Sequence, residues 1–139
     1  MILADSGFWV ALVSRDDKHH GQALRVVQAH AGETLITTWP VLAEASHLIG
    51  RGSVDLQIKF VRDVRAGACV VHPLPSEALD RMAALMQKYR DQPMDFADAS
   101  MVVLAEELGE GRVLSTDEDD FRTYCWRKNK PFENLMLQR

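Results

Sequence analysis

Four acidic side chains, spread over most of the chain, stand where apolar runs end or where helices begin. Asp5 follows the apolar run 2–4, and Asp117 comes shortly after the run 112–115. Asp98 falls in the first turn of one predicted helix, and Glu44 lies one turn into another. Because the carboxyl ends of parallel strands share one edge of an open α/β sheet, we expect these four acids to face one crevice.

Such a group of acids needs a cation. Two carboxylates about 4 Å apart repel by roughly 4 kcal/mol at an effective dielectric of 20, so they do not stay ionised together without a neutralising charge. Ligands that are all oxygen favour Mg²⁺ or Mn²⁺ over zinc. A hard divalent ion with open positions activates water and screens phosphate charge, which is the chemistry of phosphodiester hydrolysis.

Asp98 gives the strongest argument for a site of this kind. Met101, Val102 and Ala105 follow it at helical spacing, so its carboxylate borders the predicted core. No Lys or Arg follows nearby in this helix to pair with it. Asp95 has the position of an N-cap, and we assign it to capping or to a supporting role beside the ligands.

Asp5 and Glu44 each have a structural alternative. Asp5 also fits the N-cap of the helix that follows it, and its position alone does not separate capping from ligand binding. Glu44 borders the apolar face of the helix that begins at Pro40, where a glutamate commonly packs its stem and keeps its carboxylate in solvent. Both alternatives stay open at this point.

The elements that would position these acids alternate along the chain. Strand-like runs occupy 2–4, 35–38, 69–72, 112–115 and 134–137. The segments between them have helical periodicity, and Gly50 and Gly52 are expected to end the helix that starts at Pro40. This alternation predicts an α/β fold with a central parallel sheet of four to five strands and helices on both faces.

Composition limits the classes of protein. A chain of 139 residues with 47% hydrophobic residues predicts a single domain over 1–139. The start lacks a basic region, and the apolar runs are too short to span a bilayer, so we expect a cytoplasmic protein. Cys69 and Cys125 stand far apart, which argues against a zinc ribbon. A net charge of −4 argues against a protein that coats nucleic acid, although it permits a local basic patch.

Taken together, the acidic motifs resemble those of the PIN-domain nucleases, and their order is similar to that of the VapC-type ribonuclease toxins of bacterial type II toxin–antitoxin pairs. The motifs are Asp5-Ser6-Gly7, Glu44 within 40–45, Asp98 within 96–99, and Ser115-Thr116-Asp117 before Asp120-Phe121. The resemblance implies an Mg²⁺- or Mn²⁺-dependent endoribonuclease, often dimeric, whose crevice an antitoxin can block. It also implies that Asp5, Glu44, Asp98 and Asp117 are the catalytic and metal-binding residues.

Other residues of these motifs are secondary candidates. They are Ser6, Asp95, Thr116 and Asp120, and for the last of these we prefer a short helical turn that places Phe121 in the core. A substrate path is sought in the cations Arg122, Arg127, Lys128 and Lys130, which alternate with Tyr124 and Trp126 as phosphate contacts and base-stacking rings would. The apolar faces of 53–66 and 79–89 predict a homodimer through one of these helices.

Three other functions remain as alternatives. The chain could be an RNA-processing PIN nuclease without an antitoxin, or a PIN-fold interaction domain without catalysis. A haloacid-dehalogenase-like phosphatase also places an Asp after its first strand, but it needs Asp-x-Asp, and Gly7 stands at the second position. A dinucleotide-binding domain is disfavoured because no G-x-G-x-x-G follows the first strand.

Overall fold

A five-stranded parallel sheet forms the centre of the computed structural model, which describes residues 1–137. The strand order is β3-β2-β1-β4-β7. The strands are β1 (Ile2–Ala4), β2 (Leu35–Thr37), β3 (Val70–Val71), β4 (Arg112–Leu114) and β7 (Glu133–Asn134). The α/β fold predicted from the alternation of runs is therefore confirmed.

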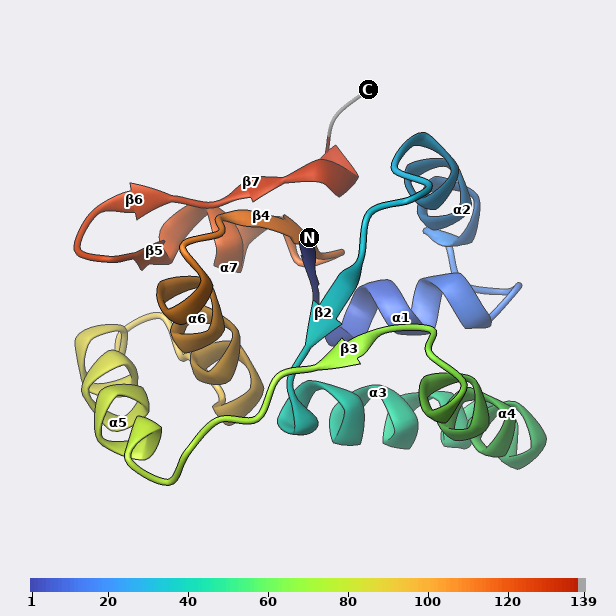
Figure 1. Cartoon of the computed structure of the whole chain (residues 1–139), viewed down its shortest axis with the longest axis horizontal. Helices are drawn as coiled ribbons and strands as arrows, with labels where there is room; N and C mark the ends of the chain where they lie inside the picture. Colours follow the sequence, from blue (N-terminus) through green and yellow to red (C-terminus); the bar gives the residue numbers. More distant parts are fainter. Residues whose placement is uncertain (138–139) are drawn as a thin grey trace.

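Helices flank this sheet in two groups. They are α1 (Ser6–Val13), α2 (His20–Ala29), α3 (Trp39–Gly52), α4 (Val54–Arg65), α5 (Ala78–Lys88), α6 (Phe96–Leu108) and α7 (Glu118–Thr123). Helix α3 packs against α1, α4 and α6, and α5 packs against α6. In Figure 1, α5 and α6 lie together at the left, whereas α1, α3 and α4 lie at the lower right. Within residues 1–137, no helix combines the length and apolarity that a bilayer crossing demands.

Helix α3 is longer than the sequence predicts, since it continues through Gly50 to Gly52. A glycine costs a helix only about 1 kcal/mol relative to alanine, which packing easily offsets. Gly50 faces α4, where the flexible end of the Gln57 side chain lies 2.5 Å from the position that a Cβ on Gly50 would take. Ser53 ends α3 with an extended backbone and caps α4 through the Leu56 N–H at 3.2 Å.

The C-terminal part differs most from the prediction. Only Glu133–Asn134 is a strand, and Leu135–Leu137 is a 3₁₀ helix that buries Leu135 and Met136. Before it, β5 (Cys125–Trp126) and β6 (Lys130–Pro131) form an antiparallel hairpin that the sequence did not indicate. Its turn gives Arg127 and Lys128 positive φ angles of 43° and 72°, a conformation usually signalled by glycine.

The core includes the sheet and α6, together with buried residues of α1, α3 and α5. Strand β1 is buried throughout, and α6 is buried from Ala99 to Ala105. Polar groups at the end of β2 are satisfied inside this core: Thr37 donates to the Ala4 carbonyl at 2.8 Å, and Thr38 shares a 2.7 Å hydrogen bond with Ser100 of α6. These contacts fix the start of α6 beside the carboxyl ends of β1 and β2.

Candidate active site

Asp5 lies directly after β1 and is only 5% exposed. Its Oδ2 accepts a hydrogen bond from the Ser115 hydroxyl at 3.0 Å, whereas Oδ1 is buried without a hydrogen-bond partner among the described residues. Burial raises the pKa of Asp5 to about 7, and the charges of Glu44 and Asp95 add to the rise. A buried carboxylate oxygen without a donor is unfavourable, so this site suits either a proton or a cation.

Glu44 is connected to the Asp5 region by a hydrogen bond from Ser6, the residue that follows Asp5. The hydroxyl of Ser6, at the start of α1, donates to Glu44 Oε1 at 3.0 Å. Ser6 is buried and Glu44 is half-buried. The charge of Glu44 acts on the pKa of Asp5. Glu44 therefore turns inward and does not extend into solvent.

Asp98 forms a capping box with Asp95 at the start of α6. Asp95 Oδ1 accepts the Asp98 N–H at 2.7 Å, and Asp98 Oδ2 accepts the Asp95 N–H at 3.3 Å. The capping role predicted for Asp95 is confirmed. Burial, followed by the charges of Asp95, Asp5 and Asp120, raises the pKa of Asp98 to about 8. Capping thus leaves Asp98 as a half-buried acid surrounded by negative charge.

The α7 segment brings two more acids. Asp117 is exposed and caps α7 by accepting the Asp120 N–H at 3.1 Å. Asp120 is half-buried; burial and then Asp117 raise its pKa to about 6, although a hydrogen bond from Gln92 opposes the rise. Of these two acids, Asp120 is the one whose charge contributes to the raised pKa of Asp98. Phe121 is buried, so the helical turn predicted to place it in the core is confirmed.

The acid crevice is our name for the neighbouring carboxylates Asp5, Glu44, Asp95, Asp98 and Asp120. Each of them raises the pKa of another member or has its own pKa raised by one. Within residues 1–137, no three His, Cys, Asp or Glu side chains stand close enough as placed to hold one ion. The donor chemistry nevertheless fits a hard divalent cation, because Asp5 Oδ1 is unpaired and every contributing ligand is oxygen.

Two residues that support the crevice lie within the acidic motifs but were not predicted as site residues. Ser115 is fully buried, donates to Asp5 and accepts the Asp117 N–H at 3.0 Å, so it connects the ends of β1 and β4. Its place at a strand end, two residues before an acid, was the available signal. Gly7 lies against Thr116, because a Cβ at this position would meet Thr116 Oγ1 and the threonine side chain would have to turn away. Thr116 thus packs on the first turn of α1.

The prediction that Tyr124 and Trp126 stack on bases is wrong. Tyr124 is fully buried and Trp126 is 8% exposed. The Tyr124 ring packs against Tyr89 and Phe121, and the Trp126 indole N–H donates to the Pro131 carbonyl at 3.2 Å. Alternating cations and rings look alike in sequence whether the rings face solvent or the core. Tyr124 instead donates its hydroxyl to Asp98 Oδ2 at 3.4 Å, which places this hydroxyl beside the acids.

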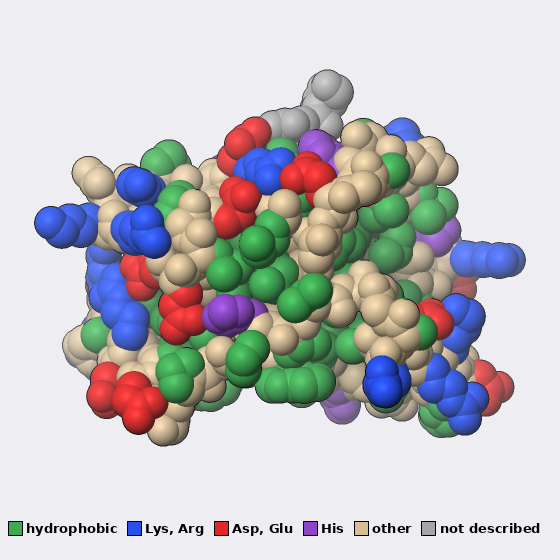
Figure 2. All heavy atoms as spheres, viewed as in Figure 1, with side chains coloured by type: hydrophobic (Ala, Val, Ile, Leu, Met, Phe, Trp, Pro, Cys, Tyr) green, Lys and Arg blue, Asp and Glu red, His purple; other side chains and the backbone are tan. Residues whose placement is uncertain are grey.

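The four cations predicted to bind RNA lie on α7 and on this hairpin, and they are only partly free. Arg127 donates from Nε and Nη2 to the Glu106 carbonyl at 3.0 and 2.6 Å, near the end of α6. Lys130 places its ammonium 4.9 Å from the centre of the Trp126 ring. Arg122 and Lys128 are exposed. Figure 2 shows Lys and Arg side chains gathered over this hairpin at the left of the view.

Comparison with known proteins identifies the family of this chain. The family model described as the PIN domain matches residues 2–126, which is most of the chain. The chain belongs to the PIN-domain family. The acid crevice therefore lies in a PIN domain, as the acidic motifs predicted.

Two relatives indicate the branch of PIN domains to which this one is similar. Ribonuclease VapC26 of Mycobacterium tuberculosis is 24% identical over 121 residues, which cover 86% of this chain and 89% of the relative. The crystal structure of M. tuberculosis VapC20, described as a Sarcin-Ricin loop cleaving toxin, superposes with a TM-score of 0.78 at 21% identity and covers 86% of this chain and 92% of VapC20. The likeness to VapC20 confirms the fold, and the resemblance to VapC-type PIN nucleases is confirmed.

Proposed function

We propose that this PIN domain is a metal-dependent endoribonuclease and the toxin of a toxin–antitoxin pair. The observation that carries the proposal is the pair Asp5 and Asp98. Asp5 is buried and Asp98 is half-buried, both have raised pKa values, and Asp5 Oδ1 has no hydrogen-bond partner among the described residues. Strongly perturbed acids gathered at the carboxyl edge of a parallel sheet are typical of a functional site. The names of the two similar proteins, a ribonuclease and a Sarcin-Ricin loop cleaving toxin, support RNA as the substrate class.

The proposed ligands of the cation are Asp5, Glu44 and Asp98, joined by Asp117 or Asp120 from the α7 segment. A bound Mg²⁺ or Mn²⁺ supplies an activated water and neutralises charge on the phosphate. The serines orient the acids: Ser115 holds Oδ2 of Asp5, and Ser6 holds Oε1 of Glu44. Near neutral pH, Asp5 and Asp98 hold protons part of the time, and these protons leave when a cation binds.

RNA would reach the crevice along the basic side of the molecule. Arg122 and Lys128 remain exposed for phosphate contacts, and Lys130 is exposed although it lies over Trp126. Arg127 contributes less in this proposal, because its guanidinium is committed to Glu106. Phosphate contacts of this kind hold RNA without reading its sequence.

We also propose a homodimer, with an antitoxin as a separate partner. Large apolar side chains are exposed on α4 and α5, among them Val61 and Leu79, and Trp39 between them is 63% exposed. Trp39 lines two hollows, one of about 400 Å³ against α4 and one of about 220 Å³ against α5. Exposed apolar surface of this extent is typical of an interface. A monomer mass by light scattering at micromolar concentration would count against the dimer.

A metal titration tests the catalytic part. Purified protein is incubated with RNA at increasing Mg²⁺ or Mn²⁺, with and without EDTA, beside Asp5→Asn and the matched control Asp80→Asn, which changes an exposed acid of α5. We expect cleavage that needs metal, is abolished by EDTA, and is lost in Asp5→Asn alone. Cleavage by wild type in EDTA would refute metal dependence. A small gene beside this one would favour a toxin, and an isolated gene would favour RNA processing.

A further inference from the structure

Tyr124 connects the end of α7 to the acid crevice. Its ring is fully buried between Tyr89 and Phe121, with ring centres 5.0 and 5.7 Å away, both edge-on. Its hydroxyl lies 3.2 Å from the Pro93 carbonyl and 3.4 Å from Asp98 Oδ2. The ring is therefore held firmly by the core while the hydroxyl reaches the start of α6.

Both acceptors of this hydroxyl belong to the segment that presents Asp98. Pro93 precedes the capping box, and Asp98 completes it. Asp98 Oδ2 also accepts the Asp95 N–H at 3.3 Å, so the two hydrogen bonds that reach this side chain from residues 1–137 end on the same oxygen. Oδ1 of Asp98 is thereby left for another ligand.

We propose that Tyr124 is a positioning residue for Asp98: its hydroxyl holds Oδ2 and thereby presents Oδ1 to the divalent cation. This inference rests on the proposed function. At 3.4 Å the hydrogen bond to Asp98 is long, and the proton is shared with Pro93. A carboxylate that binds a cation is charged, and charged acceptors form shorter and stronger hydrogen bonds than a neutral carbonyl does. Carboxylates that ligate metals are commonly oriented by such a donor.

A purely structural role is the competing explanation, and Tyr89 provides the control for it. Tyr89 contacts the same ring, and its hydroxyl accepts the Cys125 N–H at 3.0 Å; within residues 1–137 it has no contact with an acid of the crevice. Tyr89→Phe and Tyr124→Phe each remove one hydroxyl and keep the ring. A role in packing alone would give the two variants similar properties.

The first experiment measures Mn²⁺ binding without RNA, by isothermal titration calorimetry, for wild type, Tyr124→Phe, Tyr89→Phe and Asp98→Asn. We expect Tyr124→Phe to raise the Kd for Mn²⁺ about tenfold, since loss of a group that orients a ligand lowers metal affinity by roughly 10- to 100-fold. Tyr89→Phe should bind as wild type does. In cleavage assays, Tyr124→Phe should need more metal and recover most of its kcat at saturating Mn²⁺.

Equal Mn²⁺ affinities for Tyr124→Phe and wild type would overturn the role of Tyr124 and leave the proposed function standing. Failure of wild type to bind Mn²⁺, or equal binding by Asp98→Asn, would overturn the proposed function as well. In the Asp98→Asn background, Tyr124→Phe should add little, because its effect passes through Asp98.

A second measurement needs no change at Tyr124. The chain contains two tyrosines, so wild type labelled with ¹³C at Cζ gives two resonances, which Tyr89→Phe assigns. We expect Mg²⁺ to shift the Tyr124 resonance and to leave that of Tyr89 nearly unchanged. Equal shifts, or no shift of Tyr124 at saturating Mg²⁺, would refute the inference even if Tyr124→Phe failed to fold.

Discussion

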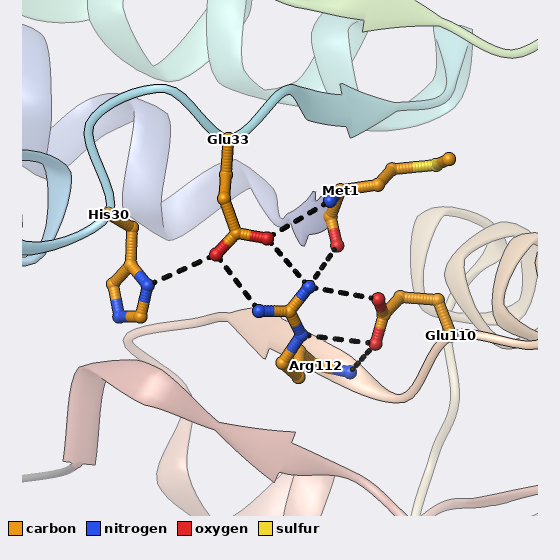
Figure 3. Close-up of polar contacts among 5 residues, drawn as sticks. All are labelled: Met1, His30, Glu33, Glu110 and Arg112. Carbon is orange, nitrogen blue, oxygen red and sulfur yellow. Dashed lines mark hydrogen bonds and ion pairs between the residues drawn. The ribbon is translucent and has the colours of Figure 1, made fainter.

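The two edges of the sheet carry similar carboxylates in opposite electrostatic settings. At the amino edge, where β1, β2 and β4 begin, Glu33 and Glu110 surround Arg112 and the Met1 ammonium (Figure 3). At the carboxyl edge, where the same strands end, the acid crevice gathers Asp5 and Asp98 with further acids. Cations balance the acids of the first edge, whereas at the second edge neighbouring acids raise the pKa values of Asp5 and Asp98.

The amino edge is a closed network. Arg112 donates from Nη1 and Nη2 to the two carboxylate oxygens of Glu33 at 2.9 and 2.8 Å, and from Nη2 to Glu110 at 3.1 Å. The Met1 ammonium donates to Glu33 Oε1 at 3.1 Å, and His30 Nδ1 lies 3.3 Å from Glu33 Oε2. The hydrogen bonds from Arg112, then those from the ammonium, lower the pKa of Glu33 to about 2. This edge is complete without a ligand.

The difference shows that acids which stabilise the fold and acids proposed to bind a cation lie at opposite edges of the same sheet. A carboxylate with a fixed cation partner favours the folded state once ionised, as Glu33 does. Asp5 and Asp98 have no such partner among the described residues, so ionising them opposes folding until a cation binds. Functional acids are commonly kept at this disadvantage, because a permanent partner would occupy the ligand oxygens.

The largest expected effect is that of Asp98→Asn, which removes one charge from the crevice. Cleavage should fall by roughly 10² or more, because loss of a metal ligand forfeits several kcal/mol of transition-state stabilisation. The metal-free protein should be as stable as wild type or more stable, since a repulsive charge is gone. Melting curves with and without Mn²⁺, together with cleavage assays, measure both. Retained cleavage and an unchanged metal-induced rise in Tm would show that the site lies elsewhere.

A smaller difference should separate the two acids of α7. Asp120 is half-buried and acts on Asp98, whereas Asp117 is exposed and caps α7. We therefore expect Asp120→Asn to lower Mn²⁺ affinity more than Asp117→Asn, which keeps a capping side chain. Calorimetric titrations of the two variants decide the order. A greater loss in Asp117→Asn would assign the fourth ligand to Asp117.

The two edges should also give opposite dependences of stability on pH. The folded-state pKa values of Asp5 and Asp98 are raised to about 7 and about 8. Their contribution to the free energy of unfolding is therefore full in acid and is lost as pH rises through these values. Glu33 behaves oppositely: its pKa falls from 4.5 to about 2, so its contribution is lost as pH falls through this range. In EDTA, Tm should therefore decline from about pH 5 to about pH 8. Mn²⁺ should reduce that decline, and a Tm in EDTA that rises over this range would contradict the raised pKa values.

The smallest effect on catalysis is expected at Arg112, the centre of the amino edge. Arg112→Gln should lower Tm, because Glu33 and Glu110 would lose their shared cation. Cleavage per folded molecule should stay near that of wild type, since the crevice lies at the other edge of the sheet. The loss in Tm should shrink at high salt, which screens exposed ion pairs. Loss of cleavage at a temperature where the variant is fully folded would break the separation between the two edges.

The sequence by itself determined the parallel α/β fold, the order of the acidic motifs, the cap at Asp95 and the burial of Phe121. These features follow from local rules, because apolar period, helix caps and strand ends are set by residues a few positions apart. Only the tertiary structure decided that Tyr124 and Trp126 are buried, that Ser115 holds Asp5, and that Arg112 joins Glu33. Each of these depends on segments far apart in the chain, and the hairpin turn at Arg127 and Lys128 has no glycine to signal it. Contacts of that kind are fixed by packing, which local periodicity does not encode.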